Sequence, residues 1–190
     1  MILSQKDIRK LVKEKKICFS PELEEKQWGE ASVDLRLGRQ FTVYRKEIRG
    51  VTLSVAEGLG SLGDLNLWET EERDSFDLIP GEMVLSLTHE SITVPNNLIA
   101  LVEGRSTYAR VGLSMHQTAP WIQPGWSGPI VLEIANHGQI PIKLTPLIDR
   151  PCQLTFLQLK SPVPKSLAYG SRKTDAYKDQ KHPLKHKKRA

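Results

Sequence analysis

The chain is organised around residues 104–133, GRSTYARVGLSMHQTAPWIQPGWSGPIVLE. This stretch opens on a short polar cluster and closes on an apolar strand, residues 129–132, which is followed directly by Glu133. Burial of a carboxyl group disfavours its charged form, and a glutamate tuned in this way can take and return a proton near neutral pH. We therefore interpret Glu133 as a candidate general acid and base. The alternative is a surface carboxylate that faces water.

Two arginines near the start of this stretch, Arg105 and Arg110, lie five residues apart. The hydroxyl groups of Ser106 and Thr107 come directly after the first of them. A guanidinium offers forked donors to phosphate oxygens and a hydroxyl adds a neutral donor, so the cluster suits an anion. The alternative is that both arginines are surface ion-pair partners.

The composition is that of one globular domain. The 190 residues include 39% hydrophobic and 26% charged side chains, enough to bury a core. Cys18 and Cys152 are too few for a disulfide framework or a metal cluster, so we expect a reducing compartment. Residues 1–20 lack the apolar segment of a signal peptide, and no stretch reaches the roughly 18 apolar residues of a membrane span. We expect a soluble, cytoplasmic protein without membrane contact.

The positive charge is concentrated at the C-terminal end. The last 20 residues hold eight lysines and arginines against two aspartates, while the whole chain carries a net charge of +5. Such a tail could be a nucleic-acid or membrane-surface patch, a solvated end, or a flap over an anionic ligand. The run at residues 185–189 is its most basic part, and the sequence alone assigns it no role.

The first part of the chain predicts a helix and a strand. Ser4 precedes an amphipathic pattern that predicts a capped helix over residues 5–15. Residues 31–43 alternate between apolar and polar side chains and predict a strand with a turn at Gly38. Residues 44–76 predict a long loop or insertion that could hold short strands, with no assigned function.

Short apolar runs separated by turn residues continue to the end of the body. Such strands at a spacing of about ten residues favour an all-β sandwich or barrel. There is neither a glycine-rich dinucleotide loop nor a P-loop, so phosphate recognition must come from side chains and turn amides. The predicted strands cover residues 77–79, 83–88, 92–94, 98–103, 130–134, 142–144 and 153–159.

The motifs GRSTYARxGL, HxTA, IxPGWSG and VLEIxN follow one another in residues 104–136, and SVDLRLG occupies residues 32–38. In this order and spacing they resemble the dCTP deaminase branch of the homotrimeric dUTPase-like family. The resemblance implies a mainly β fold, a dUTPase-like distorted β-barrel or jelly roll with a short N-terminal helix, assembled as a homotrimer. It implies a barrel domain over residues 1–165 and a flexible basic tail, residues 166–190, that closes over the nucleotide.

The resemblance also implies an activity, the hydrolytic deamination of dCTP to dUTP and ammonia, which supplies dUTP for dUMP and dTTP synthesis. The implied ligands are dCTP and dUTP, with dTTP as an inhibitor, and nucleic acid is not an expected partner. Zinc deaminases carry HxE followed by PCxxC, whereas Cys152 has no second cysteine after it and His89 is directly followed by Glu90. We therefore expect no zinc and no metal-ligating residues, and we expect Mg²⁺ to arrive bound to the triphosphate.

In the zinc-free route that the resemblance implies, Glu133 takes a proton from the attacking water and passes it to the cytosine ring and the leaving ammonia. Ser106 and the backbone carbonyl of Ala119 would hold that water. Arg110 would orient Ser106 and stabilise the developing charge. Without a metal, positioning and proton transfer must supply most of the rate.

The nucleotide would be held by the polar cluster, the strand before Glu133 and the tail. His116 would lie on a segment that shifts between active and inactive forms, and its alternative role is a hydrogen-bonded core histidine. The implied substrate-binding residues are Arg105, Ser106, Thr107, Tyr108, Ala109, Arg110, Gln123, Val131, Leu132, Glu133, Tyr169, Tyr177 and Gln180.

Two positions depart from the family pattern. Gln123 stands where the family usually has an aspartate, which meets the deoxyribose 3′-hydroxyl and is the base of the dUTPase branch. An amide can bond a hydroxyl but cannot act as a base at neutral pH. Ala176 stands where a lysine usually precedes the tail tyrosine. Two alternatives therefore stay open: a bifunctional deaminase and dUTP diphosphatase, and a nucleotide-binding relative with weakened catalysis.

Overall fold

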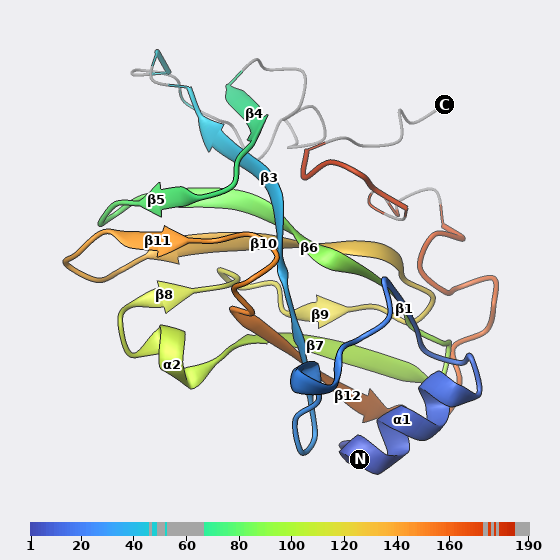
Figure 1. Ribbon diagram of the computed structural model, residues 1–190. Helices are drawn as coiled ribbons and strands as arrows, with labels where there is room; N and C mark the ends of the chain where they lie inside the picture. The colour runs from blue at the N-terminus through green and yellow to red at the C-terminus, as the bar shows by residue number, and fades with distance from the viewer. Residues whose placement is uncertain are drawn as a thin grey trace.

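The computed structural model of the chain describes residues 1–45, 47–48, 52, 67–172, 175, 177 and 179–184 (Figure 1). Its helices are α1 (Gln5–Lys13), the 3-10 helix η1 (Glu25–Gln27) and α2 (Ser106–Ala109). Its strands are β1 (Cys18–Ser20), β2 (Val33–Leu35), β3 (Leu37–Tyr44), β4 (Trp68–Glu72), β5 (Phe76–Leu78), β6 (Met83–Thr93), β7 (Leu98–Gly104), β8 (Leu113–Ser114), β9 (Trp121–Ile122), β10 (Ser127–Asn136), β11 (Ile142–Leu144) and β12 (Cys152–Gln158).

Within the described residues the fold is mainly β, which confirms the predicted fold class, and the strands form three antiparallel sheets. The largest has the order β4-β3-β6-β10-β8, with β1 also paired to β6. A second has the order β2-β12-β7-β9, and β11 pairs with β5 in a third. Phe41 of β3, Ile134 of β10 and Phe156 of β12 are all fully buried in one core, so side chains from both larger sheets fill it.

Helix α1 begins at the predicted cap. Ser4 Oγ accepts a hydrogen bond from the Asp7 N–H, and the Asp7 carboxylate accepts one from the Ser4 N–H, which completes a capping box. The bonds from Ser4 hold the pKa of Asp7 below its usual value. The helix ends at Lys13, earlier than predicted, and Lys15 takes a left-handed backbone conformation with φ of 55°.

The alternating segment 31–43 is two strands that belong to different sheets. Strand β2 pairs with β12, whereas β3 pairs with β6 and β4, so the chain changes sheet at Arg36. The predicted turn at Gly38 is wrong, because Gly38 lies inside β3. A Cβ there would be 2.7 Å from the Leu87 carbonyl oxygen, so the glycine permits a close backbone approach rather than a turn.

A buried polar network occupies this change of sheet. Glu90 of β6 is fully buried, and its Oε1 accepts hydrogen bonds from Arg36 Nε at 2.7 Å and from Gln27 Nε2 at 3.0 Å. Its Oε2 accepts one from the Arg36 backbone N–H at 2.8 Å. The carboxylate is thus paired and hydrogen-bonded on both oxygens, the condition under which a charge is tolerated in a core.

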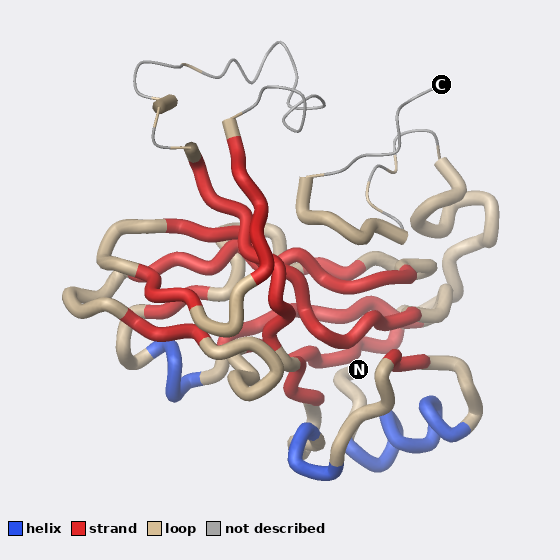
Figure 2. The backbone as a smooth tube through the Cα atoms, turned by 45° about the horizontal axis from the view of Figure 1, so that its top comes forward, coloured by secondary structure: helices blue, strands red, loops and turns tan. Residues whose placement is uncertain are grey.

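The charged run after residue 67 belongs to the segment predicted as a long loop or insertion that could hold short strands, and residues 68–72 form the short strand β4. It pairs with β3 from Gln40 opposite Glu72 to Tyr44 opposite Trp68, and the Tyr44 and Trp68 rings stack 3.7 Å apart. In Figures 1 and 2 the two strands rise together out of the body of the molecule. Most of the rest of the predicted insertion, residues 46, 49–51 and 53–66, lies outside the described residues.

Strand β6 is the centre of the largest sheet. The separate predictions for 83–88 and 92–94 are one strand, which pairs with β1, β3 and β10. On β10 the register places Glu133 opposite Leu85, with an irregularity between Pro129 and Val131. Glu133 is therefore fixed by strand pairing well inside a sheet.

The two cysteines have opposite environments. Cys152 of β12 is fully buried, and burial, with smaller contributions from the Glu90 and Asp34 carboxylates, raises the pKa of its thiol to about 12. Cys18 of β1 is exposed, and its Sγ lies 3.5 Å from the Lys15 carbonyl. Both thiols are free.

Candidate functional site

The Glu133 side chain emerges from an otherwise buried part of β10. Its neighbours Leu132 and Ile134 are fully buried, whereas Glu133 is half-buried, as alternation along a strand requires. Glu133 Oε2 accepts a hydrogen bond from the Gln117 backbone N–H at 2.9 Å. The Glu133 N–H donates to the Met115 carbonyl at 3.1 Å, so the segment after β8 runs beside the carboxylate.

The tail packs against the turn before β10. The Tyr169 N–H donates to the Pro124 carbonyl at 2.8 Å, and the Tyr169 ring contacts Trp126 with 5.3 Å between centroids. The Asp179 N–H donates to the Ser127 carbonyl at 2.9 Å. Gly125 has a φ of +88°, and a Cβ there would meet the Ala168 Cβ at 2.9 Å, so this docking depends on the glycine.

Tyr177 is the tail residue that lies near Glu133. Its N–H donates to the Tyr169 hydroxyl at 3.1 Å. Burial raises the pKa of Tyr177, and the nearby Glu133 carboxylate raises it further. Gln180 is buried, and its Oε1 accepts no hydrogen bond from the part of the chain that the structure describes. The three predicted tail residues therefore lie over the turn and strand that lead to Glu133.

Arg105 stands at the start of α2 and is held by Asp34. Its Nη1 lies 3.2 Å from Asp34 Oδ2 and 3.3 Å from the Arg150 carbonyl, and Arg150 Nη1 lies 3.8 Å from the same carboxylate. Burial raises the pKa of Asp34, while the Arg105 and Arg150 guanidinium groups lower it. About a third of the Arg105 side chain stays exposed. Two cations share one carboxylate, so the cluster keeps an excess positive charge.

The rest of α2 presents its side chains to solvent. Ser106, Thr107, Ala109 and Arg110 are exposed, whereas Tyr108 is half-buried. The Tyr108 hydroxyl lies 3.4 Å from Asp149 Oδ1, and burial together with that carboxylate raises the pKa of the phenol.

The predicted residues therefore form two groups within one chain. The first is the α2 cluster, and the second is Glu133 with the tail. Within the described ranges, no hydrogen bond or ion pair joins Glu133 to Ser106 or Arg110.

The remaining predicted residues lie on the connection to β10 and on that strand. Ala119 and Gln123 are exposed, on either side of the short strand β9. Val131 is half-buried, but the Leu132 side chain is fully buried in the core, so Leu132 can offer a ligand only its backbone. Ala176 and the run at residues 185–189 lie outside the described residues.

His116 lies between the two groups in sequence. Its Nε2 is 3.5 Å from Glu103 Oε2, an ion pair when the imidazole is protonated. Its Nδ1 is buried and makes no hydrogen bond within the described parts of the chain.

The hydrogen bond from Gln117 to Glu133 could not be predicted from the sequence. Gln117 follows His116 within the HQTA motif, and no feature of an exposed glutamine in a loop distinguishes it. Its partner is fixed by the register of β10 and by the path of the chain after β8, which only the structure supplies.

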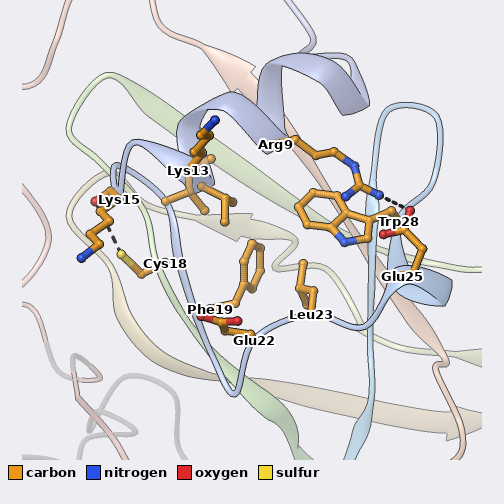
Figure 3. Close-up of a pocket in the computed structure, with 11 residues that line it drawn as sticks. Arg9, Lys13, Lys15, Cys18, Phe19, Glu22, Leu23, Glu25 and Trp28 are labelled. Carbon is orange, nitrogen blue, oxygen red and sulfur yellow. Dashed lines mark hydrogen bonds and ion pairs between the residues drawn. The ribbon is translucent and has the colours of Figure 1, made fainter.

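A surface hollow of about 530 Å³ lies beneath α1 and shares no residue with the predicted site. Figure 3 shows Phe19 and Leu23 side by side below the helix, with Trp28 at one end. The Arg9 guanidinium stacks over Trp28, 4.2 Å from the ring centroid, and pairs with Glu25 at 2.5 Å. These contacts anchor α1 to the body of the protein.

Groups of three or more His, Cys, Asp or Glu side chains placed to hold a metal ion are absent from the described residues. The same residues contain no helix of the length and apolar character needed to cross a membrane.

Comparisons with known proteins agree with the fold and the motifs. The family model described as dCTP deaminase-like matches residues 2–159. A protein of Dictyoglomus turgidum named dCTP deaminase, dUMP-forming, is 38% identical over 184 residues, covering 96% of this chain and 92% of that protein. A Colwellia psychrerythraea protein named dCTP deaminase is 35% identical over 187 residues, covering 95% and 92%.

One solved structure shows the same fold. The crystal structure of 2′-deoxycytidine 5′-triphosphate deaminase from Agrobacterium tumefaciens superposes with a TM-score of 0.65 at 24% identity. The match covers 87% of this chain and 50% of that one, so this chain spans about half the length of that relative.

Proposed function

Because the chain belongs to the dCTP deaminase-like family, we propose that it catalyses the hydrolytic deamination of dCTP. One observation carries the proposal: Glu133 is a half-buried carboxylate, oriented by a backbone N–H and approached by the tail tyrosine Tyr177. A carboxylate fixed in this way is the group that a metal-independent deamination requires.

In the proposed reaction a water oxygen bonds to C4 of the cytosine ring while Glu133 takes a proton from that water. Glu133 then gives this proton to the ring nitrogen. It next takes the proton of the C4 hydroxyl and passes it to N4, so that the C4–N4 bond breaks, the C4 carbonyl forms and ammonia leaves. The products are dUTP and ammonia. Ser106 and the Ala119 carbonyl hold the water, and Arg110 stabilises the charge that develops around C4.

The triphosphate is proposed to bind the α2 cluster, with the tail closing over it. About a third of the Arg105 side chain is exposed, and its Nη1 pairs with Asp34, which it shares with Arg150. The Arg105 guanidinium is therefore held in place without its charge being fully neutralised. Thr107 adds an exposed hydroxyl. Mg²⁺ enters as part of the substrate, bound to the triphosphate oxygens, its usual mode of binding in proteins that handle nucleotides.

Two copies of the chain are proposed to complete each site in a homotrimer. Among the described residues of a single chain, no hydrogen bond or ion pair joins the α2 cluster to Glu133, although the mechanism requires both beside C4. A second copy can supply the missing half, since a cyclic assembly repeats the same junction at every interface.

The test is ammonia release from dCTP by the wild type and by Glu133→Gln. The amide fills the same space but cannot shuttle protons, so turnover should fall by at least about 10²-fold while dCTP binding persists. Equal turnover in the two proteins would assign the proton transfers to another group. Nucleotide binding without ammonia release in the wild type would indicate a relative with weakened catalysis.

A second candidate function is deamination followed by hydrolysis to dUMP. It is favoured by the dUMP-forming names of relatives such as the Dictyoglomus turgidum protein. Gln123 opposes it, because an amide cannot supply the base that activates water for diphosphate release. Product analysis separates the two: dUTP alone supports the first function, and dUMP with pyrophosphate supports the second.

A further inference from the structure

A hydrogen-bonded clasp holds Gln117 against the strand that carries Glu133. The Gln117 N–H donates to Glu133 Oε2 at 2.9 Å, and the Gln117 side-chain Nε2 donates to the Glu133 carbonyl at 3.1 Å. Nε2 also lies 3.4 Å from Ser114 Oγ. One residue therefore contacts both the backbone and the carboxylate of Glu133.

The clasp lies where regular strand pairing gives way to the loop. Leu113 and Ser114 of β8 pair with the end of β10, and the Glu133 N–H donates to the Met115 carbonyl. Two residues later the Gln117 side chain supplies the anchor. The side-chain Nε2 of Gln117 bonds to the Glu133 carbonyl and lies near Ser114 Oγ. These contacts hold the Gln117 backbone N–H in one position toward the Glu133 carboxylate.

We propose that Gln117 is a positioning residue for Glu133, an inference that rests on the proposed function. The N–H bond occupies Oε2, so the proton transfers fall to Oε1, and Gln117 fixes how that oxygen faces the substrate. Orientation of the base in this way supplies much of the rate where no metal acidifies the water.

The first test is Gln117→Met, which keeps the length of the side chain and removes the amide. We expect kcat for ammonia release to fall about 10-fold with KM for dCTP within about 2-fold, because geometry and not substrate binding is lost. Gln117→Glu also removes the donor and should lose at least as much. Gln117 is exposed, so both variants should unfold at the wild-type temperature.

The matched control is Gln139→Met, the same change at an exposed glutamine on the turn after β10. It should leave kcat unchanged. Equal losses in the two methionine variants would assign the effect to general surface change and overturn the inference.

The decisive measurement is the double variant with Glu133→Gln. If Gln117 acts through Glu133, adding Gln117→Met to Glu133→Gln should cause no further loss of rate. A double variant about 10-fold slower than Glu133→Gln, or a Gln117→Met enzyme with wild-type kcat, would overturn this inference alone. Wild-type turnover in Glu133→Gln would overturn the proposed function as well.

Discussion

Several charged residues of this chain form ion pairs in partly or fully buried positions. Glu90 accepts hydrogen bonds from Arg36 and Gln27 in the core, and Asp34 pairs with Arg105 at the edge of the α2 cluster. The sequence places Arg36 and Asp34 on one face of a strand, but it cannot supply their partners Glu90 and Arg105, which lie 54 and 71 residues further along the chain. Glu133 could be singled out from its apolar neighbours, whereas Gln117 could not.

Glu90→Ala should lower the free energy of unfolding by about 3–5 kcal/mol, because it leaves the Arg36 charge and the Gln27 amide without their acceptor. Urea unfolding followed by tryptophan fluorescence measures the change. Glu30→Ala, at an exposed position, is the control and should change stability by less than about 0.5 kcal/mol. If Glu90→Ala does not fold, Glu90→Gln, which keeps an acceptor, should fold with a smaller loss. A Glu90→Ala protein as stable as wild type would show that the network contributes nothing.

At the scale of elements, regular patterns were predictable and short or crossing segments were not. Alternation or apolar runs located the positions of β7, β10, β11 and β12, and the Ser4 cap located α1. Strands β8 and β9 have two residues each, too short for any periodicity to show. The turn predicted at Gly38 is absent because a glycine that leaves room for a neighbouring carbonyl cannot be told apart, in sequence, from one that permits a turn.

The tail is the element whose role is most directly testable. A cut after Lys165 removes Tyr169, Tyr177 and Gln180, and it should raise KM for dCTP and lower kcat, because closure orders the triphosphate and excludes water. The control is a cut after Leu184, which removes the basic run but keeps the described contacts, including the one between His182 Nε2 and Thr70 Oγ1 at 2.9 Å. Steady-state kinetics compare the two.

If the two cuts change KM and kcat equally, the contact with the nucleotide is made by the basic run at residues 185–189. If the cut after Leu184 already abolishes a salt-sensitive interaction with nucleic acid and leaves deamination unchanged, the run is instead a nucleic-acid patch.

At the scale of the whole molecule, the proposed assembly makes a quantitative prediction. Arg110→Ala and Glu133→Gln chains should each form inactive trimers alone. In trimers assembled randomly from equal amounts of both, a site that takes its two halves from different chains is intact in about a quarter of cases. Co-expressed, doubly tagged protein should therefore recover a substantial part of the wild-type kcat.

Separately purified trimers that are mixed without exchange provide the control and should stay inactive. A site contained within one chain gives no recovery in any mixture, since every chain then carries one defect. A stable monomer in sedimentation would likewise contradict the shared site.

The unequal environments of the two cysteines make the wild-type chain ready for site-specific fluorescent labelling. A maleimide dye reacts with thiolate, so the buried Cys152, with a pKa of about 12, stays unmodified in the native protein and Cys18 takes the dye. Cys18 pairs with Thr93, and Thr93 pairs in turn with Ser127, whose carbonyl receives the tail at Asp179. A dye on Cys18 would therefore sit two strands away from the docked tail. It would report optically on the closure of the tail over the nucleotide.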